Sequence, residues 1–292
     1  MKINGIVLAT VTRVQDFKRF MDELNVCGEG FLIKPNWSNA NTYTSARTLD
    51  LLFSFLDEDK TIIEGYTAWR NKLNTGPEPQ DFITPRNANK KWKWIREQDE
   101  WFLQHSGIGK VLKKHGVEYV NITKEVWSGR VAAQEKIKRV VEAIFASLKN
   151  QEMYGFIPSK IYDLRGRAFI SLNLSRRTRE VMSLSTKNLF GLIPDPARYG
   201  KWHGPNDSLL PQSIVDINKL YRSLFKPCFW INEIKERGLL VGSKNSVEAD
   251  ALTAIIFGAD PKKIGYLQLA VEVFGSYDEA VVKRALNRLE SL

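Results

Sequence analysis

The sequence predicts an α/β fold: a mostly parallel β-sheet flanked by helices, with a helical C-terminal third. Two observations support this prediction. Short apolar runs rich in β-branched and aromatic residues have the length of strands, and stretches with helical spacing alternate with them. Parallel neighbours need crossover connections, which helices provide compactly, so the alternation favours a parallel sheet. The length of 292 residues allows a single domain over residues 1–292 or two lobes of about 1–150 and 151–292.

Six runs are predicted as strands because each is short and apolar. They are GIVLAT (5–10), GFLIKP (30–35), KTIIEG (60–65), VEYVNI (117–122), AFISLN (168–173) and CFWINE (228–233). Helical spacing predicts helices between and after them, over Val14–Leu24, Ala46–Leu56, Trp101–Lys114, Ile137–Leu148, Ser213–Leu224, Val247–Phe257, Tyr266–Val273 and Asp278–Leu289.

Two features mark the boundaries of these elements. Gly116 follows three basic residues and is typical of a helix C-cap, which makes 117–122 the next strand. The stretch from Tyr66 to Lys93 has no sustained period. We interpret it as a long excursion that is either a functional loop or irregular covering structure.

Composition limits the kinds of partner and site. The net charge of +10 predisposes the surface to anions such as nucleic acid, nucleotides or carboxylates. Two distant cysteines, Cys27 and Cys228, give no disulfide framework, and His105, His115 and His203 lack metal-ligand spacing, so no metal site is expected. No apolar run has the length of a membrane helix and the N-terminus turns polar too early for a secretory signal, so we expect a cytoplasmic protein without a membrane partner.

Polar residues gather where the predicted strands end. The second strand ends in Lys34, Pro35 and Asn36, the third in Glu64, and the fifth in Asn173. Ligands of open α/β sheets bind outside the carboxyl ends of the strands. A cation, a carboxylate and amides at one edge suit an anionic or multiply hydroxylated ligand. The alternative is structural, with a salt bridge between Lys34 and Glu64 and asparagines that turn the chain.

Two further segments carry candidate site residues. In Ser183–Gly191, hydroxyl side chains precede Lys187 and Asn188, as in an anion site at a helix N-terminus, although capping hydroxyls beside a surface lysine explain the pattern equally well. Asp250 falls on the apolar side of its predicted helix and is expected to be buried. A buried carboxylate needs a partner, for which we expect a lysine from the strand ends, either in a functional site or in a core ion pair.

Aromatic and basic residues are interleaved in the run Lys90–Arg96, with Trp101 following. Nucleic-acid surfaces combine these residue types, because rings stack on bases while cations meet phosphates. The spacing also fits the buried face of a helix, which is the favoured interpretation. His203 can act as an acid or base near neutral pH, but a single loop histidine is more often an ordinary polar residue at the surface.

The chain resembles the family called domain of unknown function 362. The resemblance rests, in order, on GFLIKPNW, KTIIEG, AFISLNLSRR, STKNLFGLIP, His203 and VEADALTAIIFGADPKKIGYLQLA, and it extends from about Gly30 to Ala270. Its most specific pieces are Ile33–Asn36, Lys187–Gly191 and the helix with Asp250, followed by a Gly-Ala-Asp-Pro turn.

This resemblance implies an α/β fold, prokaryotic cytoplasmic occurrence and a shared site lined by Lys34, Asn36, Lys187, Asn188 and Asp250. Many members carry an attached ferredoxin-like iron–sulfur segment. Two distant cysteines cannot hold such a cluster, so this chain is expected to be a divergent member without one.

Two departures from the family pattern bear on activity. Ser175–Arg177 stands where the family usually has Lys-x-His, and Asn232–Gly238 stands where it usually has a Gly-rich loop. If those features support a reaction in relatives, this member binds the ligand without turning it over, or acts on something different.

Two hypotheses about function follow. In the first, an enzyme or former enzyme binds a small anionic metabolite: Lys34, Arg176 and Lys187 hold its negative groups, and Asp250 or Glu64 orients a lysine or moves a proton. The further ligand-binding residues of this hypothesis are Asn36, Asn173, Asn188 and His203. In the second, a nucleic-acid-binding surface is formed by Arg86–Trp101, Arg165, Arg167, Arg176, Arg177 and Arg179. The sequence leaves the cofactor, the reaction and the oligomeric state open.

Overall fold

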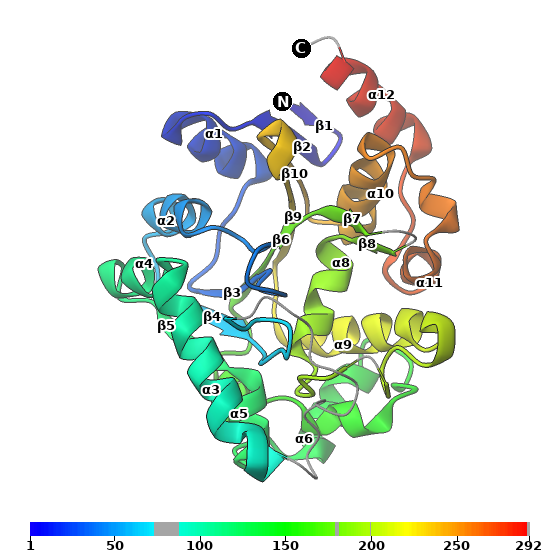
Figure 1. Ribbon diagram of the computed structural model, residues 1–292. Helices are drawn as coiled ribbons and strands as arrows, with labels where there is room; N and C mark the ends of the chain where they lie inside the picture. Colours follow the sequence, from blue (N-terminus) through cyan, green and yellow to red (C-terminus); the bar gives the residue numbers. More distant parts are fainter. Residues whose placement is uncertain (73–87, 179–180, 199, 291–292) are drawn as a thin grey trace.

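A computed structural model of the chain describes residues 1–72, 88–178, 181–198 and 200–290, and in these the α/β prediction is confirmed. An eight-stranded sheet forms the centre, with helices on both of its faces (Figure 1). The order across the sheet is β1 (Lys2–Ile3), β2 (Ile6–Thr10), β10 (Leu239–Ser243), β9 (Cys228–Ile234), β6 (Ala168–Leu174), β3 (Phe31–Pro35), β4 (Lys60–Glu64) and β5 (Glu118–Asn121). Strands from both halves of the chain therefore share one sheet.

The strand order creates a place for a ligand. β9, β6, β3, β4 and β5 are parallel neighbours, so their carboxyl ends lie at one edge, while β10, β2 and β1 continue the sheet antiparallel. The chain runs outward from β3 to β4 and β5 and then returns to place β6 on the other side of β3. The β3–β6 pair is therefore a topological switch point, where the connections diverge and leave a crevice.

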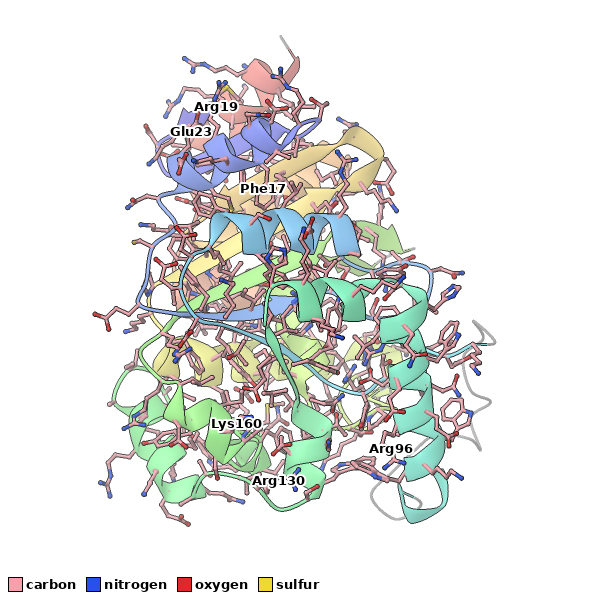
Figure 2. All side chains as sticks on the ribbon, turned by 90° about the vertical axis from the view of Figure 1, so that its left-hand side faces the viewer. Phe17, Arg19, Glu23, Arg96, Arg130 and Lys160 are labelled. Atoms are coloured by element: carbon pink, nitrogen blue, oxygen red, sulfur yellow. The ribbon has the colours of Figure 1, made fainter. Side chains whose placement is uncertain are left out.

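One face of the sheet is covered by α1 (Val14–Leu24), α2 (Ala46–Phe55), α4 (Ile108–Lys114) and part of α3 (Ala88–His105) (Figure 1). α1 shows why: Phe17 and Phe20 recur at helical spacing and are buried against the sheet, whereas Arg19 points to solvent (Figure 2). The aromatic and aliphatic side chains of these helices form one core with Ile33 and Ile170 of the central strands.

The other face carries the second core. It is covered by α6 (Gln134–Glu142), α8 (Ser185–Asn188), α9 (Leu210–Leu224), α10 (Ser246–Ile256) and α11 (Gly265–Phe274) (Figure 1). α9 is buried along most of its length because it packs against α6, α8 and α11. The last helix, α12 (Glu279–Glu290), packs on α10 and β1. In the described part of the chain, none of the helices combines the length and apolar character that crossing a bilayer requires.

All six predicted strands are present, and the predicted helices need three corrections. Trp101–Lys114 is divided at Gly107, whose φ of 74° ends one helix and starts the next. α3 begins at Ala88, inside the stretch expected to be irregular up to Lys93, and α6 ends at Glu142 rather than near Leu148. Residues 73–87 of that stretch lie outside the described residues.

The sequence prediction omitted β10, which pairs with both β9 and β2. Only Lys235–Gly238 separates it from β9, and Gly238 supplies the positive φ of 56° that this tight connection uses. Interpreting the segment up to Gly238 as a loop hid a β-hairpin.

Candidate functional site

A pocket of about 290 Å³ lies at the carboxyl edge of the parallel strands, beside the β3–β6 switch point. Seven of the nine site residues predicted from the sequence line it: Lys34, Asn36, Glu64, Arg176, Lys187, Asn188 and His203. The other two, Asn173 and Asp250, are buried behind this wall and connect to it through hydrogen bonds. The pocket thus draws on β3, β4, the segment around β7 (Arg176–Thr178) and α8.

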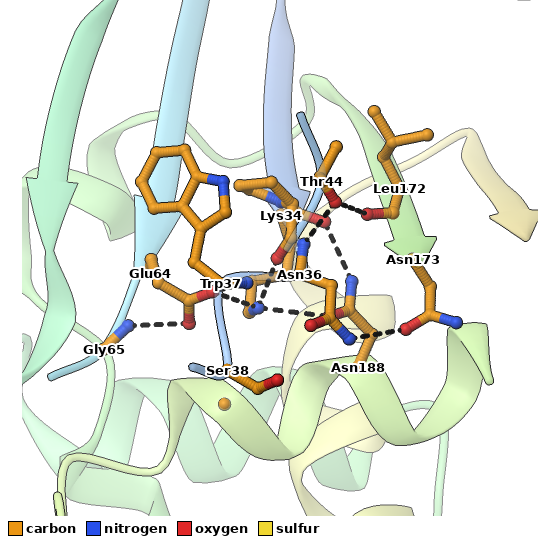
Figure 3. Close-up of polar contacts among 12 residues, drawn as sticks. Lys34, Asn36, Trp37, Ser38, Thr44, Glu64, Gly65, Leu172, Asn173 and Asn188 are labelled. Carbon is orange, nitrogen blue, oxygen red and sulfur yellow. Dashed lines mark hydrogen bonds and ion pairs between the residues drawn. The ribbon is translucent and has the colours of Figure 1, made fainter. Parts of the chain in front are cut away.

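The ammonium of Lys34 is fully partnered. Its Nζ donates to Glu64 Oε2 at 2.8 Å, to the carbonyl of Pro35 at 2.6 Å and to Asn188 Oδ1 at 3.2 Å (Figure 3). Three acceptors use all three N–H bonds of an ammonium. The salt bridge between Lys34 and Glu64, which the sequence offered as the structural alternative, is present and buried.

The carboxylate of Glu64 is equally occupied. Besides Lys34, Oε2 accepts the backbone N–H of Trp37 at 3.1 Å, and Oε1 accepts that of Gly65 at 2.9 Å (Figure 3). Burial lowers the pKa of Lys34 to about 8, although the negative charge of Glu64 opposes the shift. The pair therefore ties the ends of β3 and β4 together, and Lys34 cannot donate to a ligand without giving up a present partner.

A line of buried amides leads from the pocket into the protein. Asn36 Nδ2 donates to Asn173 Oδ1 at 2.7 Å, and Asn173 Nδ2 donates to Asn232 Oδ1 at 3.0 Å (Figure 3 shows the first of these bonds). Asn232 Nδ2 then donates to Asp250 Oδ1 at 2.8 Å. The amides of Asn173 and Asn232 both donate and accept, so these four residues hold the ends of β3, β6 and β9 in register with α10.

Asp250 anchors the start of α8. Its Oδ1 accepts the backbone N–H and the hydroxyl of Ser185, at 2.9 and 2.5 Å, and its Oδ2 accepts the N–H of Thr186 at 3.0 Å. Burial raises the pKa of the Asp250 carboxyl, against the effect of these hydrogen bonds. The expectation of a lysine partner is wrong, because within the described ranges no cation pairs with Asp250 and its partners are backbone, hydroxyl and amide donors.

Lys187 of α8 differs from Lys34. Its side chain is half-buried in the pocket wall and packs on Phe190, with Nζ 5.9 Å from the ring centroid. Across the residues that the structure describes, its ammonium has no hydrogen bond and no ion pair. Burial together with the nearby charges of Arg176 and Arg198 lowers the pKa of Lys187 to about 8, while Asp207 opposes the shift.

Arg176, Arg198 and His203 complete the polar wall of the pocket. Arg176 donates to Ser38 Oγ at 2.9 Å and lines the pocket. Arg198 holds backbone carbonyls, including those of Tyr66 at 2.7 Å and Gly191 at 2.8 Å.

His203 is buried rather than a surface residue. Its Nδ1 lies 2.6 Å from Asp207 Oδ1, and its ring meets Phe190 edge-on. Burial lowers the pKa of His203, so its neutral form dominates at pH 7.

Two glycines let the walls approach closely. A Cβ on Gly191 would lie 2.9 Å from Glu64 Oε1 and 3.1 Å from Lys34 Nζ. One on Gly65 would lie 2.5 Å from the carbonyl of Gly191. Side chains at these positions would force the Lys34–Glu64 pair and the η3 segment (Leu189–Leu192) apart.

Comparison with known protein families, with curated proteins and with solved structures finds no match to this chain. The assignment of function therefore depends on the geometry of the site. In the described residues, no three His, Cys, Asp or Glu side chains come together as a metal site would require.

The nucleic-acid surface predicted as an alternative is divided in the structure. Arg165 and Arg167 precede β6 and Arg176 and Arg177 follow it, so a seven-residue strand, about 23 Å long, separates the two pairs. Arg179 and Arg86 lie outside the described residues.

The basic aromatic helix is also largely committed to other contacts. On α3, Lys93 pairs with Glu97 and Arg96 with Glu100, while Ile95 is buried. Trp92 packs on Tyr66 and Trp127, which supports the favoured interpretation of this run as a helix face.

Sequence reasoning missed several residues of the site region. Trp37, Ser38, Trp69, Phe190 and Arg198 line the pocket. Behind it, Arg70 and Asp99 form a buried ion pair, and Arg70 also donates to the carbonyls of Trp37 and Gly65. Trp37 directly follows the Lys-Pro-Asn strand exit and could have been found from that position. Arg198 and Arg70 stand in segments without period, and no local signal marks them.

Proposed function

We propose that this chain binds a small anionic metabolite in the pocket at the carboxyl edge of its sheet, as an enzyme or a former enzyme. The observation that carries the proposal is the ammonium of Lys187, which lies in the pocket wall with no hydrogen bond or ion pair in the described part of the chain. A half-buried charge without a partner is unfavourable, and a bound anion would relieve that cost.

The charges around the pocket support the same ligand class. Its wall carries four cations, Lys34, Arg176, Lys187 and Arg198, and one carboxylate, that of Glu64. Glu64 is already paired with Lys34, and across the described residues the ammonium of Lys187 has no hydrogen bond or ion pair. A pocket wall in which positive charges outnumber negative ones attracts ligands of negative charge.

The resemblance to the family called domain of unknown function 362 adds support from the sequence. Four of the five residues that it implies for a shared site, Lys34, Asn36, Lys187 and Asn188, line this pocket. The fifth, Asp250, holds the start of the helix that carries Lys187.

Thermal unfolding at low ionic strength tests the proposal. Inorganic phosphate, pyrophosphate, citrate and 2-oxoglutarate are compared with glycerol as a neutral probe. A ligand present at 100 times its Kd stabilises the native state by about 2.7 kcal/mol, which corresponds to a rise in Tm of about 4 °C for a chain of this size. At least one anion is expected to produce such a rise.

Two variants locate the binding. Lys187→Gln is expected to remove most of the rise, whereas Lys18→Gln, an exposed lysine on α1, is expected to keep it. Equal responses of these two variants, or no response of the unaltered protein to any of the anions, would overturn the proposal.

A further inference from the structure

Two lysines in one pocket wall have opposite surroundings, and the difference bears on chemistry. The Nζ of Lys34 donates hydrogen bonds to Glu64, Pro35 and Asn188. The Nζ of Lys187 makes no hydrogen bond or ion pair with the described residues and lies 5.9 Å from the ring centroid of Phe190. A lysine that no carboxylate holds, and that lies beside other cations, is easily deprotonated, and its neutral amine is a nucleophile.

We propose that Lys187 is a nucleophilic amine that forms an imine with a 2-oxo acid whose carboxylate is bound by Arg176. This inference rests on the proposed anion-binding function and names the class of ligand. A 2-oxo acid places its carbonyl carbon directly next to its carboxylate, so one cation can hold the acid while a neighbouring amine reaches the carbonyl. Arg176 and Lys187 line the same pocket, and the charge of each is felt by the other.

The step balances without an oxidant or reductant. The neutral amine of Lys187 adds to the carbonyl carbon, and the oxygen takes up the proton that the nitrogen releases. Loss of water from this adduct then forms the C=N bond, so amine and carbonyl give imine and water. His203 lies in the same pocket, is oriented through Nδ1 by Asp207, and is suited to relay this proton.

The groups that face Lys187 favour the neutral amine while the pocket contains no ligand. Burial disfavours its protonation most, Arg176 from β7 and Arg198 from the segment after η3 add to this effect, Asp207 beside His203 opposes it, and Phe190 contributes no acceptor. The resulting pKa of about 8 leaves about half of Lys187 neutral at pH 8. An ordinary lysine, with a pKa near 10.4, is neutral in less than about 1% of molecules at that pH.

Imine trapping tests the inference. The full chain is incubated at pH 8 with pyruvate and sodium cyanoborohydride, which reduces an imine to a stable secondary amine, and the modified lysines are located by peptide mass spectrometry. Modification of Lys187 is expected to be about tenfold faster than that of exposed Lys18, because the larger neutral fraction outweighs the lower intrinsic nucleophilicity of a less basic amine. Acetone, which lacks the carboxylate, is expected to modify Lys187 much more slowly than pyruvate.

Lys187→Arg separates this inference from the function on which it rests. The variant keeps the positive charge, so it should keep anion-induced thermal stabilisation while forming no adduct at position 187. Stabilisation by anions without selective modification of Lys187 by pyruvate would overturn the imine and leave the binding function standing. Equal modification by pyruvate and acetone would overturn the role of Arg176. Absence of stabilisation by every anion would overturn the binding function itself.

Discussion

Lys34 at the end of β3 and Lys187 on α8 lie in the wall of the same pocket, and burial brings the pKa of both to about 8. Around Lys34, Glu64 and two uncharged acceptors satisfy the ammonium completely. Around Lys187, the nearest charged groups are mainly cations, and none of the described residues bonds to it. Burial is the main cause of both pKa shifts, but the partners differ: a bonded carboxylate opposes the shift of Lys34, whereas Arg176 and Arg198 add to that of Lys187 and only Asp207 opposes it.

This difference separates a group that builds the site from one that is available to a ligand. A saturated buried ion pair fixes geometry, and removing one member leaves the other charged and alone. An unsaturated cation costs stability in the empty protein and becomes favourable only when an anion arrives. The two ends of the pocket should consequently respond to the same substitution with opposite signs.

The largest expected effect on the free energy of unfolding is at Lys34, whose ammonium is fully hydrogen-bonded. Lys34→Met removes the cation and leaves the carboxylate of Glu64 buried, so the free energy of unfolding should fall by about 3–5 kcal/mol. Urea unfolding followed by circular dichroism measures the change. The double variant Lys34→Met/Glu64→Gln, in which no unpaired charge remains, should recover part of the loss. A cost below about 1 kcal/mol for Lys34→Met would show that the ion pair does not hold β3 to β4.

A smaller loss is expected for Asp250→Asn. The carboxylate accepts hydrogen bonds from Ser185, Thr186 and Asn232, and an amide has only one oxygen with which to replace two. At least one buried donor loses its acceptor, at a cost of about 2 kcal/mol. Because Asp250 positions α8, anion-induced stabilisation through Lys187 should weaken as well.

Urea unfolding and the thermal titration with anions measure these two consequences of Asp250→Asn. Glu272→Gln, at an exposed position of α11, is the matched control and should change the free energy of unfolding by less than about 0.5 kcal/mol. If Asp250→Asn responds to anions as the unaltered protein does, Asp250 does not act on the pocket through α8.

The sequence predicts the place of the site better than the hydrogen-bond and ion-pair partners of its residues. Strand ends follow from local apolar patterning, and parallel strands bring their carboxyl ends to one edge, so Lys34, Asn36 and Glu64 could be grouped without coordinates. The partners of each group depend on contacts between residues far apart in the chain. Lys34 meets Asn188, and Asp250 meets Ser185, through the packing of α8 on the strand ends, which no local pattern encodes.

The fold shows the same limit. β10 was missed because the segment up to Gly238 was interpreted as a loop, and its second pairing partner, β2, lies at the other end of the chain. Arg198 was missed because it acts on backbone carbonyls, among them that of Tyr66, which leave no trace in side-chain chemistry. A positive residue in an irregular segment looks the same whether it is solvated or buried.

The smallest expected effect on the free energy of unfolding, and the one of opposite sign, is at Lys187. Lys187→Met keeps an unbranched side chain, one atom shorter, beside Phe190 but removes a half-buried charge without a partner in the described part of the chain. The free energy of unfolding at pH 7 should rise by about 1–2 kcal/mol, while stabilisation by anions is lost.

Since folding lowers the pKa of Lys187 to about 8 from the reference value of 10.5, the charged form is penalised fully below pH 8. The penalty disappears between about pH 8 and 10.5, as the lysine becomes neutral in both the folded and the unfolded state. The advantage of the methionine variant should therefore be largest below pH 8 and shrink above it, which urea unfolding over this pH range measures. A methionine variant less stable than the unaltered protein at pH 7 would mean that Lys187 has a stabilising partner, and the contrast with Lys34 would no longer hold.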